Sequence, residues 1–359
     1  MPINKIWHAA TIAALAAVLT AAQSIPATAA GFSVTPLDSN LFSVNGNPAD
    51  GELIDAWGVA FSPTSPFWIN DNGTGLSTLY NSTGVKEGLV VTIPPPKGKP
   101  GPSAPDGMVF NATSDFQITV NGNSTPAAFI FATEDGTISA WAGGTEATLV
   151  YDGSKNHTVF KGLALLSTTN GNFLLATDFD HAAIDVFNGQ FKLVDTLTNL
   201  NVPTNYAPFN VAVLNGVIYV TFALQNKFKH DDLAGPGRGF VETLSLDGPP
   251  VFQPLINRTD LNAPWGVAIA PTSFGTLAGD LLVGNFGDGT IHAYDATTGA
   301  EVGPLLNTTG APIFIDGLWE LTPGNDHSAG SSQNIYFTAG PNAETNGIFG
   351  VIAASVPNT

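Results

Sequence analysis

A short pattern of small and apolar residues recurs six times along the chain. Each copy has one variable residue, then Gly or Asn, and then an apolar run that is typical of a β-strand. The six copies are Trp57-Gly58-Val59-Ala60, Asp106-Gly107-Met108-Val109, Lys161-Gly162-Leu163-Ala164, Phe209-Asn210-Val211-Ala212, Trp265-Gly266-Val267-Ala268 and Asp316-Gly317-Leu318-Trp319. Successive Gly or Asn positions lie 48 to 56 residues apart, a spacing that indicates a repeat architecture.

Each copy is followed by a second apolar run and then, after a turn, by a third. The third run is nearly identical in two repeats, Asp135-Gly136-Thr137-Ile138 and Asp288-Gly289-Thr290-Ile291. Asp-Gly between two strand-like runs is a strong signal for a β-hairpin. Each repeat therefore predicts an antiparallel sheet of three strands, with a fourth, outer strand in most copies.

These repeats predict an all-β protein that forms a six-bladed β-propeller. The alternative is a solenoid, which would need end repeats with polar outer faces, and the sequence has none. The last repeat ends soon after its third strand, and an unpaired strand-like run stands at residues 32–37. We predict that this N-terminal strand completes the blade of residues 316–352, which closes the ring and removes an exposed sheet edge.

The N-terminal segment predicts secretion. Lys5 precedes an apolar run over residues 9–22, and Ala27 and Ala29 then fit a small-residue cleavage pattern. A membrane anchor is the alternative, for which the run is short. We expect three segments: a signal peptide at 1–29, the propeller at 30–352 and a C-terminal tail at 353–359. The mature protein would be secreted and extracellular, or periplasmic in a Gram-negative source.

Charge and cysteine content restrict the partners. The chain has no cysteine, which excludes thiol catalysis, cysteine metal sites and disulfides. Its 29 acidic and 11 basic residues give a net charge of −18, a poor match for nucleic acid or anionic membranes. We expect no nucleic-acid partner, no membrane insertion and a monomer. Seven Asn-x-Ser/Thr sequons would accept N-linked glycans if the source is eukaryotic.

A functional site in such a fold is expected at one mouth of the central channel. The first strand of each blade lines the channel, and the loops that enter it share one face with the turns between second and third strands. The first-strand candidates for ligand binding are Trp57, Asp106, Lys161, Phe209, Trp265 and Asp316. The second-strand candidates for metal binding are Asp71, Glu134, Asp178 and Asn285.

These side chains predict a bound Ca²⁺ or another divalent cation, since hard cations prefer carboxylate and amide oxygens. Lys161 can pair with Asp106 or Glu134, and Trp57 and Trp265 can stack on a sugar ring. The alternative is a structural role for the whole set. Asp and Asn at strand ends make turns and caps, and aromatic side chains at a propeller axis plug the channel.

The fourth repeat carries a long insertion between its second and third strands, residues 225–239, which should lie over the mouth. Within it, His230 followed by Asp231 and Asp232 can form a metal pair or an acid–base pair, or belong to a solvated loop. The sequence has no serine nucleophile elbow, zinc-protease motif, P-loop or dinucleotide fingerprint. Covalent serine catalysis and nucleotide chemistry therefore have no support.

Several of these phrases resemble a known family of secreted, largely uncharacterised proteins with NHL-like or gluconolactonase-like propeller repeats. The resemblance is carried by Trp57-Gly58-Val59-Ala60, Pro264-Trp265-Gly266-Val267-Ala268, Asp288-Gly289-Thr290-Ile291 and Ile315-Asp316-Gly317-Leu318-Trp319-Glu320-Leu321. It covers nearly the whole mature chain and implies the six-bladed fold, without an agreed activity.

A looser similarity links the repeats to the gluconolactonase and strictosidine-synthase group. The lactonases of that group hold a divalent cation at the channel mouth with Glu, Asn and Asp. This similarity implies a comparable role for Asp71, Asp178 and Asn285, which fall at compatible second-strand ends. The sequence departs from the lactonase pattern at Trp57, which stands where those enzymes have their first-strand Glu.

Two functions remain. The first is an extracellular β-propeller binding scaffold that recognises a small molecule, a glycan or a protein at the channel mouth. The second is a metal-dependent, lactonase-like hydrolase in which the cation polarises a carbonyl and activates water. We favour the binding scaffold, because the first-strand Glu of the lactonases is missing.

Overall fold

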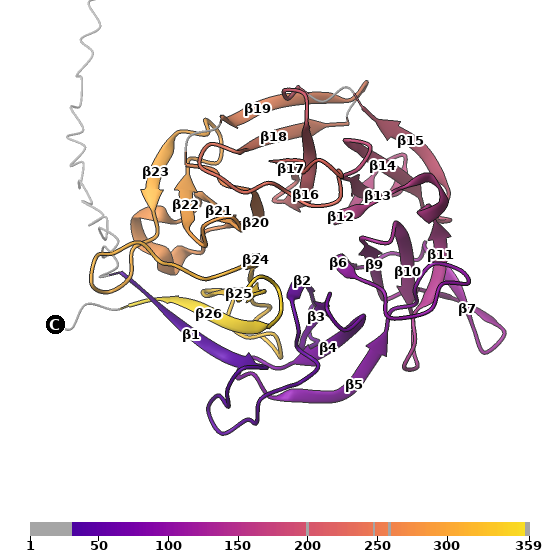
Figure 1. Ribbon diagram of the computed structural model, residues 1–359, viewed down its shortest axis with the longest axis horizontal. Helices are drawn as coiled ribbons and strands as arrows, with labels where there is room; N and C mark the ends of the chain where they lie inside the picture. The colour runs from indigo at the N-terminus through magenta and orange to yellow at the C-terminus, as the bar shows by residue number, and fades with distance from the viewer. Residues whose placement is uncertain (1–30, 199–200, 247, 258–259, 356–359) are drawn as a thin grey trace, which may run out of the picture.

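The chain folds into six four-stranded antiparallel sheets arranged around a central channel, which is a six-bladed β-propeller (Figure 1). The computed structural model describes residues 31–198, 201–246, 248–257 and 260–355. The predicted all-β class and the number of blades are confirmed. The signal peptide predicted at 1–29 lies outside the described residues.

The first three blades follow one another along the chain, from the channel outwards in each sheet. Blade 1 contains β2 (Ala56–Ala60), β3 (Phe67–Asp71), β4 (Leu76–Tyr80) and β5 (Lys86–Thr92). Blade 2 contains β6 (Pro105–Phe110), β9 (Phe129–Thr133), β10 (Thr137–Trp141) and β11 (Thr148–Asp152). Blade 3 contains β12 (Phe160–Thr168), β13 (Gly171–Asp178), β14 (Ala183–Asn188) and β15 (Leu193–Leu197).

The second half of the ring has the same order, except that its last outer strand comes from the N-terminus. Blade 4 contains β16 (Tyr206–Leu214), β17 (Val217–Leu224), β18 (Gly239–Ser245) and β19 (Val251–Asn257). Blade 5 contains β20 (Pro264–Ile269), β21 (Leu281–Asn285), β22 (Ile291–Tyr294) and β23 (Glu301–Pro304). Blade 6 contains β24 (Leu318–Pro323), β25 (Ile335–Ala339), β26 (Ile348–Ala354) and β1 (Phe32–Ser39).

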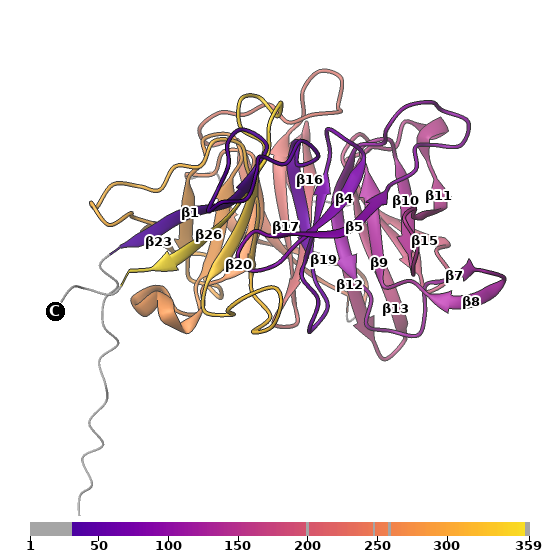
Figure 2. The same cartoon turned by 90° about the horizontal axis from the view of Figure 1, so that it is seen from below.

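Additions to this plan are small and lie outside the channel. A hairpin of β7 (Gln117–Val120) and β8 (Asn123–Pro126) projects from the rim of blade 2 (Figure 2). Two 3₁₀ helices, η1 (Ser154–Asn156) and η2 (Thr272–Leu277), stand in connecting segments. Within the described ranges, no helix is long and apolar enough to cross a membrane.

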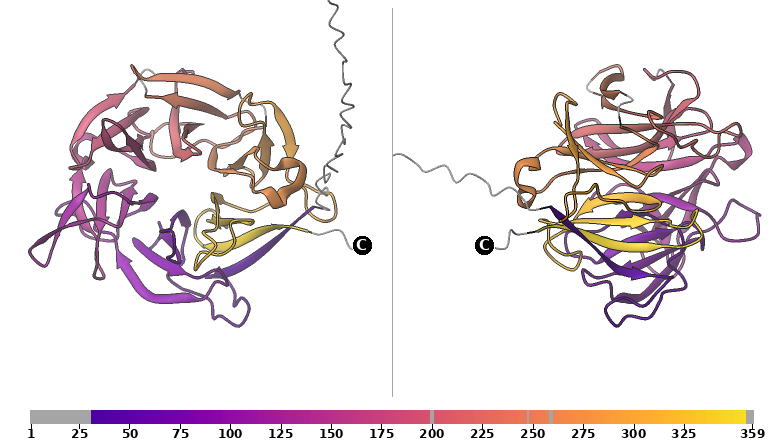
Figure 3. Two further views of the ribbon diagram at one scale, coloured as in Figure 1. Left: turned by 180° about the vertical axis from the view of Figure 1, so that it is seen from behind. Right: turned by 60° about the vertical axis from the view of Figure 1, so that its left-hand side comes forward.

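The N-terminal strand closes the ring as predicted. β1 pairs antiparallel with β26, with Phe32 opposite Ala354 and Ser39 opposite Ile348. The indigo strand therefore forms the outer edge of the yellow blade in Figure 3. Phe32 packs into the core between blades 5 and 6, and Leu37 into the core between blades 6 and 1. The first described strand thus joins the two ends of the repeat array.

Apolar side chains fill the space between each pair of neighbouring blades. Second strands such as β3 and β9 are buried along their full length, because each of their two faces packs against a neighbouring blade. A seventh cluster lies on the axis and joins side chains from several blades. Because a blade buries its faces only against its neighbours, closure of the ring is a condition for a complete core.

A β-bulge at the same place in every inner strand explains the recurring Gly or Asn. The pairing of each first strand with its second strand shifts register there, for example between Ala56 and Val59 in blade 1. A Cβ on Gly58 would lie 2.2 Å from the carbonyl oxygen of Asp106 in the next blade. The sixth copy departs from the prediction, because Glu320 occupies its bulge position and Gly317 lies in the preceding turn with φ of +66°.

Gly58→Ala should therefore destabilise the propeller. The added methyl group would overlap the Asp106 carbonyl, and overpacking of this kind costs about 1–3 kcal/mol. The free energy of unfolding from urea denaturation measures the effect. Gly88→Ala in β5 is the matched control, since a Cβ there meets nothing within 4 Å. Equal stability of the two variants would contradict a close inter-blade approach at the bulge.

Candidate functional site

The inner-strand bulge places one side chain per blade in the channel at the same level. Residues directly before the bulge Gly, Asn or Glu form this ring: Trp57, Asp106, Lys161, Phe209, Trp265 and Trp319. Five of these residues were predicted. The prediction for blade 6 was wrong by three residues. Asp316, the predicted member, is exposed in the turn before β24 and accepts the backbone N–H of Asn342 at 2.9 Å. The ring member from blade 6 is Trp319.

The aromatic members of this ring plug the channel. Trp57 stacks on Trp319 with centroids 3.6 Å apart, and Trp265 meets Phe209 edge-on at 5.0 Å. Phe286 stacks on Trp319 at 3.9 Å. Trp57 is 2% exposed, and Phe209 and Trp265 are fully buried. A ligand ring could stack on Trp57 or Trp265, as predicted, only if the plug opened.

The predicted second-strand set does not converge on the channel, because its members belong to two different faces. Asp71, Asp178 and Asn285 pair with the residues before the ring positions, whereas Glu134 lies one residue further along its blade. Successive side chains of a strand point to opposite faces, so a shift of one residue changes the direction completely. The channel-facing residue of blade 1 is Asn72, which sequence reasoning missed.

The three displaced side chains are engaged in local hydrogen bonds. Asp71 accepts from the Thr78 hydroxyl at 2.7 Å, and Asp178 lies 2.7 Å from Nδ1 of His181. The Asn285 amide donates to the Thr290 hydroxyl and accepts from the Asn262 backbone. Among the predicted metal ligands, only Glu134 therefore reaches the mouth. A cation held jointly by the four residues is excluded in this arrangement.

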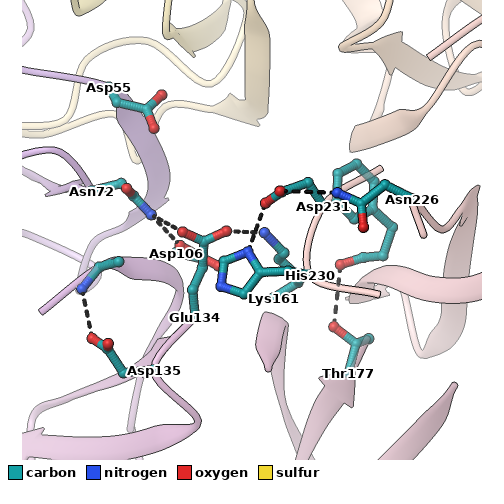
Figure 4. Close-up of polar contacts among 12 residues, drawn as sticks. Asp55, Asn72, Asp106, Glu134, Asp135, Lys161, Thr177, Asn226, His230 and Asp231 are labelled. Carbon is teal, nitrogen blue, oxygen red and sulfur yellow. Dashed lines mark hydrogen bonds and ion pairs between the residues drawn. The ribbon is translucent and has the colours of Figure 1, made fainter. Parts of the chain in front are cut away.

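Charged residues from blades 1, 2 and 3 gather on top of the plug (Figure 4). Lys161 forms an ion pair with Glu134, and both side chains are largely buried, 2% and 13% exposed. The Lys161 ammonium also lies 4.8 Å from the centre of the Trp57 ring. The Asn72 amide donates to Asp106 at 2.7 Å and to Glu134 at 3.1 Å. Asn72 heads one of the sequons, but these contacts occupy its amide.

Burial shifts the protonation equilibria of this cluster in opposite directions. It raises the pKa of Asp106 well above the ordinary value, and the negative charge of Glu134 adds to the effect. Burial alone would lower the pKa of Lys161, but Glu134 and Asp106 raise it above its usual range. Asp55, which accepts from the Trp319 indole at 2.9 Å, also has a pKa raised by burial. The cluster therefore favours a charged Lys161, whereas burial opposes ionisation of Asp106 and Asp55.

One oxygen of this cluster has no partner among the described residues. Oδ1 of Asp106 accepts from Asn72, whereas Oδ2 is buried and makes no hydrogen bond within the described ranges. Asp106 has no exposed surface. A buried polar atom without a partner costs about 1–3 kcal/mol, so such an atom indicates a bound water or ligand.

The blade 4 insertion reaches this cluster from across the channel. Gln225 anchors its start through a 2.5 Å hydrogen bond to the Phe179 carbonyl, and Asn226 holds Asp231 at 3.1 Å. His230 lies 2.7 Å from Asp231, and this hydrogen bond raises the pKa of His230 and lowers that of Asp231. Figure 4 shows His230 and Asp231 of the insertion beside Lys161 and Glu134, in agreement with the prediction that the insertion lies at the mouth.

The insertion completes a group of potential metal ligands that the sequence alone did not assemble. One ligand atom each of Glu134, His230 and Asp231 lies within 4.8 Å of the others. A second such group among the described residues, Asp260, His292 and Glu301, lies on blade 5 away from the plug. Imidazole together with carboxylate suits Zn²⁺ or Mn²⁺, whereas Ca²⁺ prefers oxygen ligands alone. A cation at this group would thus meet one imidazole and two carboxylates, whereas the prediction of Ca²⁺ rested on oxygen ligands alone.

Comparison with known proteins places the chain among relatives of viral origin. It is 32% identical over 316 residues to an uncharacterized protein of Acanthamoeba polyphaga mimivirus, covering 84% of this chain and 76% of that protein. A second uncharacterized protein of the same virus is 31% identical, with 84% and 80% covered. The chain belongs to the family of these mimivirus proteins. No family model matches it.

Solved structures support the fold of this family member but not an activity. A protein of unknown function from Bacteroides thetaiotaomicron superposes with a TM-score of 0.53 and 14% identity, covering 89% of this chain and 76% of that one. The soluble aldose sugar dehydrogenase of Escherichia coli gives 0.51 and 12%, covering 90% and 99%. The neighbours are six-bladed β-propellers, which confirms the predicted resemblance at the level of the fold.

Asp106→Asn should stabilise the protein in a pH-dependent way. A raised folded-state pKa means that wild type loses stability as pH rises from the unfolded pKa, about 3.9, towards the folded value. Asparagine keeps the oxygen that accepts from Asn72 but does not ionise. Urea unfolding should show the variant more stable than wild type at pH 8, with a smaller difference at pH 4. The exposed Asp316→Asn is the control. A difference that does not change with pH would contradict the shifted pKa.

Proposed function

We propose that the protein is an extracellular binding propeller whose channel mouth holds a small polar ligand together with a divalent cation. The observation that carries this proposal is the approach of His230 and Asp231, from the blade 4 insertion, to Glu134 of blade 2. Glu134 precedes His230 and Asp231 by about a hundred positions in sequence, and the residues meet only because the repeats form a ring. His230 and Asp231 hydrogen-bond to each other within the insertion, but no turn or cap accounts for their approach to Glu134 of another blade.

The cation proposed here is a transition metal such as Zn²⁺ or Mn²⁺. His230 supplies an imidazole, and Glu134 and Asp231 supply carboxylates, a mixed set of the kind these ions take. Glu134 already accepts from Lys161 and Asn72, so a bound cation would share its carboxylate with an ammonium group. The repulsion between cation and ammonium makes us expect modest affinity.

The ligand proposed here is polar because the mouth offers charged groups above a closed floor. The plug removes the aromatic faces from reach, since Trp57 and Trp265 are buried. What remains within reach of a ligand is the group of Glu134, His230 and Asp231, with the buried Asp106 and Lys161 beneath it. Carboxylates accept from hydroxyl groups, and an imidazole can donate or accept, so the hydroxyl groups of a sugar-like molecule would complete their hydrogen bonds.

One observation favours the second function, lactonase-like hydrolysis. Asp106 has a strongly raised pKa beside the Lys161–Glu134 pair, and perturbed carboxyls next to a metal-ligand group are the usual components of acid–base catalysis. In that case the cation would polarise a carbonyl and Asp106 would donate a proton to the leaving oxygen. A screen of lactones and simple esters with the metal-loaded protein separates hydrolysis from binding.

Metal addition should raise the melting temperature, and His230→Ala should abolish the effect. At a hundredfold excess over the dissociation constant, a ligand that binds only the folded state adds about 2.7 kcal/mol. A stabilisation of 1 kcal/mol shifts the melting temperature by about 2–4 °C in proteins of 150–250 residues, and by less in longer chains. We therefore expect a shift of a few degrees here. Thermal melts in Zn²⁺, Mn²⁺, Ca²⁺ and chelator measure it, and we expect Zn²⁺ or Mn²⁺ to exceed Ca²⁺.

The matched control is His292→Ala, which removes the imidazole of the second group of potential ligands. That variant should keep the metal-dependent shift. Absence of a shift with every metal would overturn the cation site at the mouth. A shift that survives His230→Ala but is lost in His292→Ala would place the metal on blade 5.

A further inference from the structure

The channel contains a cavity on the side of the plug away from the mouth. Inner strands run from the mouth to the opposite, exit face, so the residues after the ring positions line this lower part. The cavity has a volume of about 270 Å³ and receives side chains from all six inner strands. Apolar residues such as Val59, Met108, Leu163 and Val267 form most of its wall.

The cavity wall has one titratable side chain among the described residues, Glu320 of β24. Its other polar side chains are occupied: Asn210 donates to the Trp265 carbonyl at 3.2 Å and accepts from the Val211 N–H at 2.8 Å. The Thr322 hydroxyl donates to the Pro323 carbonyl at 3.3 Å. A ligand in this cavity would therefore meet an apolar wall and a single carboxyl group.

Glu320 stands where four of the other blades have glycine and one has asparagine. The equivalent bulge residues are Gly58, Gly107, Gly162, Asn210 and Gly266. A Cβ on Gly266 would lie 2.4 Å from the Trp319 carbonyl, so glycine there serves packing alone. Packing does not require a carboxylate at the sixth position, since glycine or asparagine serves elsewhere. The residue is thus unexplained by the architecture.

The surroundings of Glu320 only partly satisfy a negative charge. One carboxylate oxygen accepts from the Leu321 backbone N–H at 3.2 Å. The Trp265 indole N–H makes no hydrogen bond of ordinary geometry, but it lies close enough to favour the charged form. Burial outweighs both and raises the pKa of Glu320 to about 7. No basic side chain lines the cavity among the described residues, so the counter-charge is missing.

We infer that this exit-side cavity is a binding site for a small organic cation, an alkylammonium group that pairs with Glu320 while its chain packs on the apolar wall. An ammonium supplies the charge and the donors that the carboxylate lacks, and the alkyl part replaces water on apolar surface. The volume is below the range of drug-sized ligands, which restricts the occupant to a short chain. The plug separates this site from the mouth, so it stands independently of the proposed function.

The test compares n-butylammonium with its neutral counterpart n-butanol by calorimetric titration of the full protein. The alcohol cannot pair with the charge of Glu320, so wild type should bind the ammonium at least about tenfold more tightly than the alcohol. Glu320→Gln should remove this preference. Binding of the ammonium to wild type should strengthen from pH 6 to pH 8, as Glu320 ionises, and should be independent of pH in the variant.

Two controls locate the effect. His230→Ala at the mouth should leave the binding of n-butylammonium unchanged, which keeps this site distinct from the metal site. Comparison of the two ligands on wild type needs no variant, so the test holds even if Glu320→Gln does not fold. Equal affinity for ammonium and alcohol, or no binding of the ammonium at millimolar concentration, would overturn the inference.

Discussion

The close approach of neighbouring inner strands at the bulge is the constraint on which the rest of this structure depends. At that level the carbonyl of one blade points at the bulge of the preceding blade, and a Cβ on Gly58 or Gly266 would stand within 2.4 Å of it. Side chains of the preceding blade bind four of these carbonyls. Asn70 donates to that of Asp106, Thr177 to Phe209, Asn210 to Trp265 and Thr338 to Trp57. The ring is therefore joined by its backbone as well as by the apolar cores.

This constraint also creates the site. A bulge turns the residue before it out of the regular alternation, and here it turns each one into the channel. Six side chains therefore occupy the same narrow section of the channel. Where they are aromatic they exclude water and form the plug, and where they are Asp106 and Lys161 they carry charge into a nearly dry environment. The shifted pKa values of the mouth follow from that position beside the plug.

The sequence predicted the ring more securely than the site, for reasons visible in particular residues. Six repeats and an unpaired first strand are enough to predict six blades and their closure, because both depend only on period and pairing. The direction of a side chain at a strand end depends on a register of one residue. Asp71 and Asn72 are both plausible ligands by type, and only the pairing of Ala56 with Asp71 decides which faces the channel.

The sixth repeat shows a different difficulty. The repeated pattern is also matched by Asp316-Gly317-Leu318-Trp319, but the pairing shows another equivalent. The residues equivalent to Trp265-Gly266-Val267 are Trp319-Glu320-Leu321. Only a sequence alignment that allowed Glu at the glycine position would have found it. The group of Glu134, His230 and Asp231 joins blade 2 to an insertion of blade 4, and no local pattern could reveal it. Burial of Trp57 likewise depends on stacking with Trp319. That contact could not be predicted while Asp316 was taken as the ring residue of blade 6.

The composition of the plug finally argues that packing does not require Asp106 or the Lys161–Glu134 ion pair. Four of the six ring positions hold aromatic residues, which shows that this channel can be filled by apolar side chains. Replacing a buried ion pair by packed apolar residues is often neutral or stabilising, because desolvation offsets the attraction. Asp106 and Lys161 nevertheless occupy the two adjacent ring positions of blades 2 and 3. Those positions lie beneath Glu134, where His230 and Asp231 of the blade 4 insertion arrive. The polar residues of the ring thus lie under the blade 4 insertion, an arrangement that packing does not require and that agrees with the ligand site proposed here.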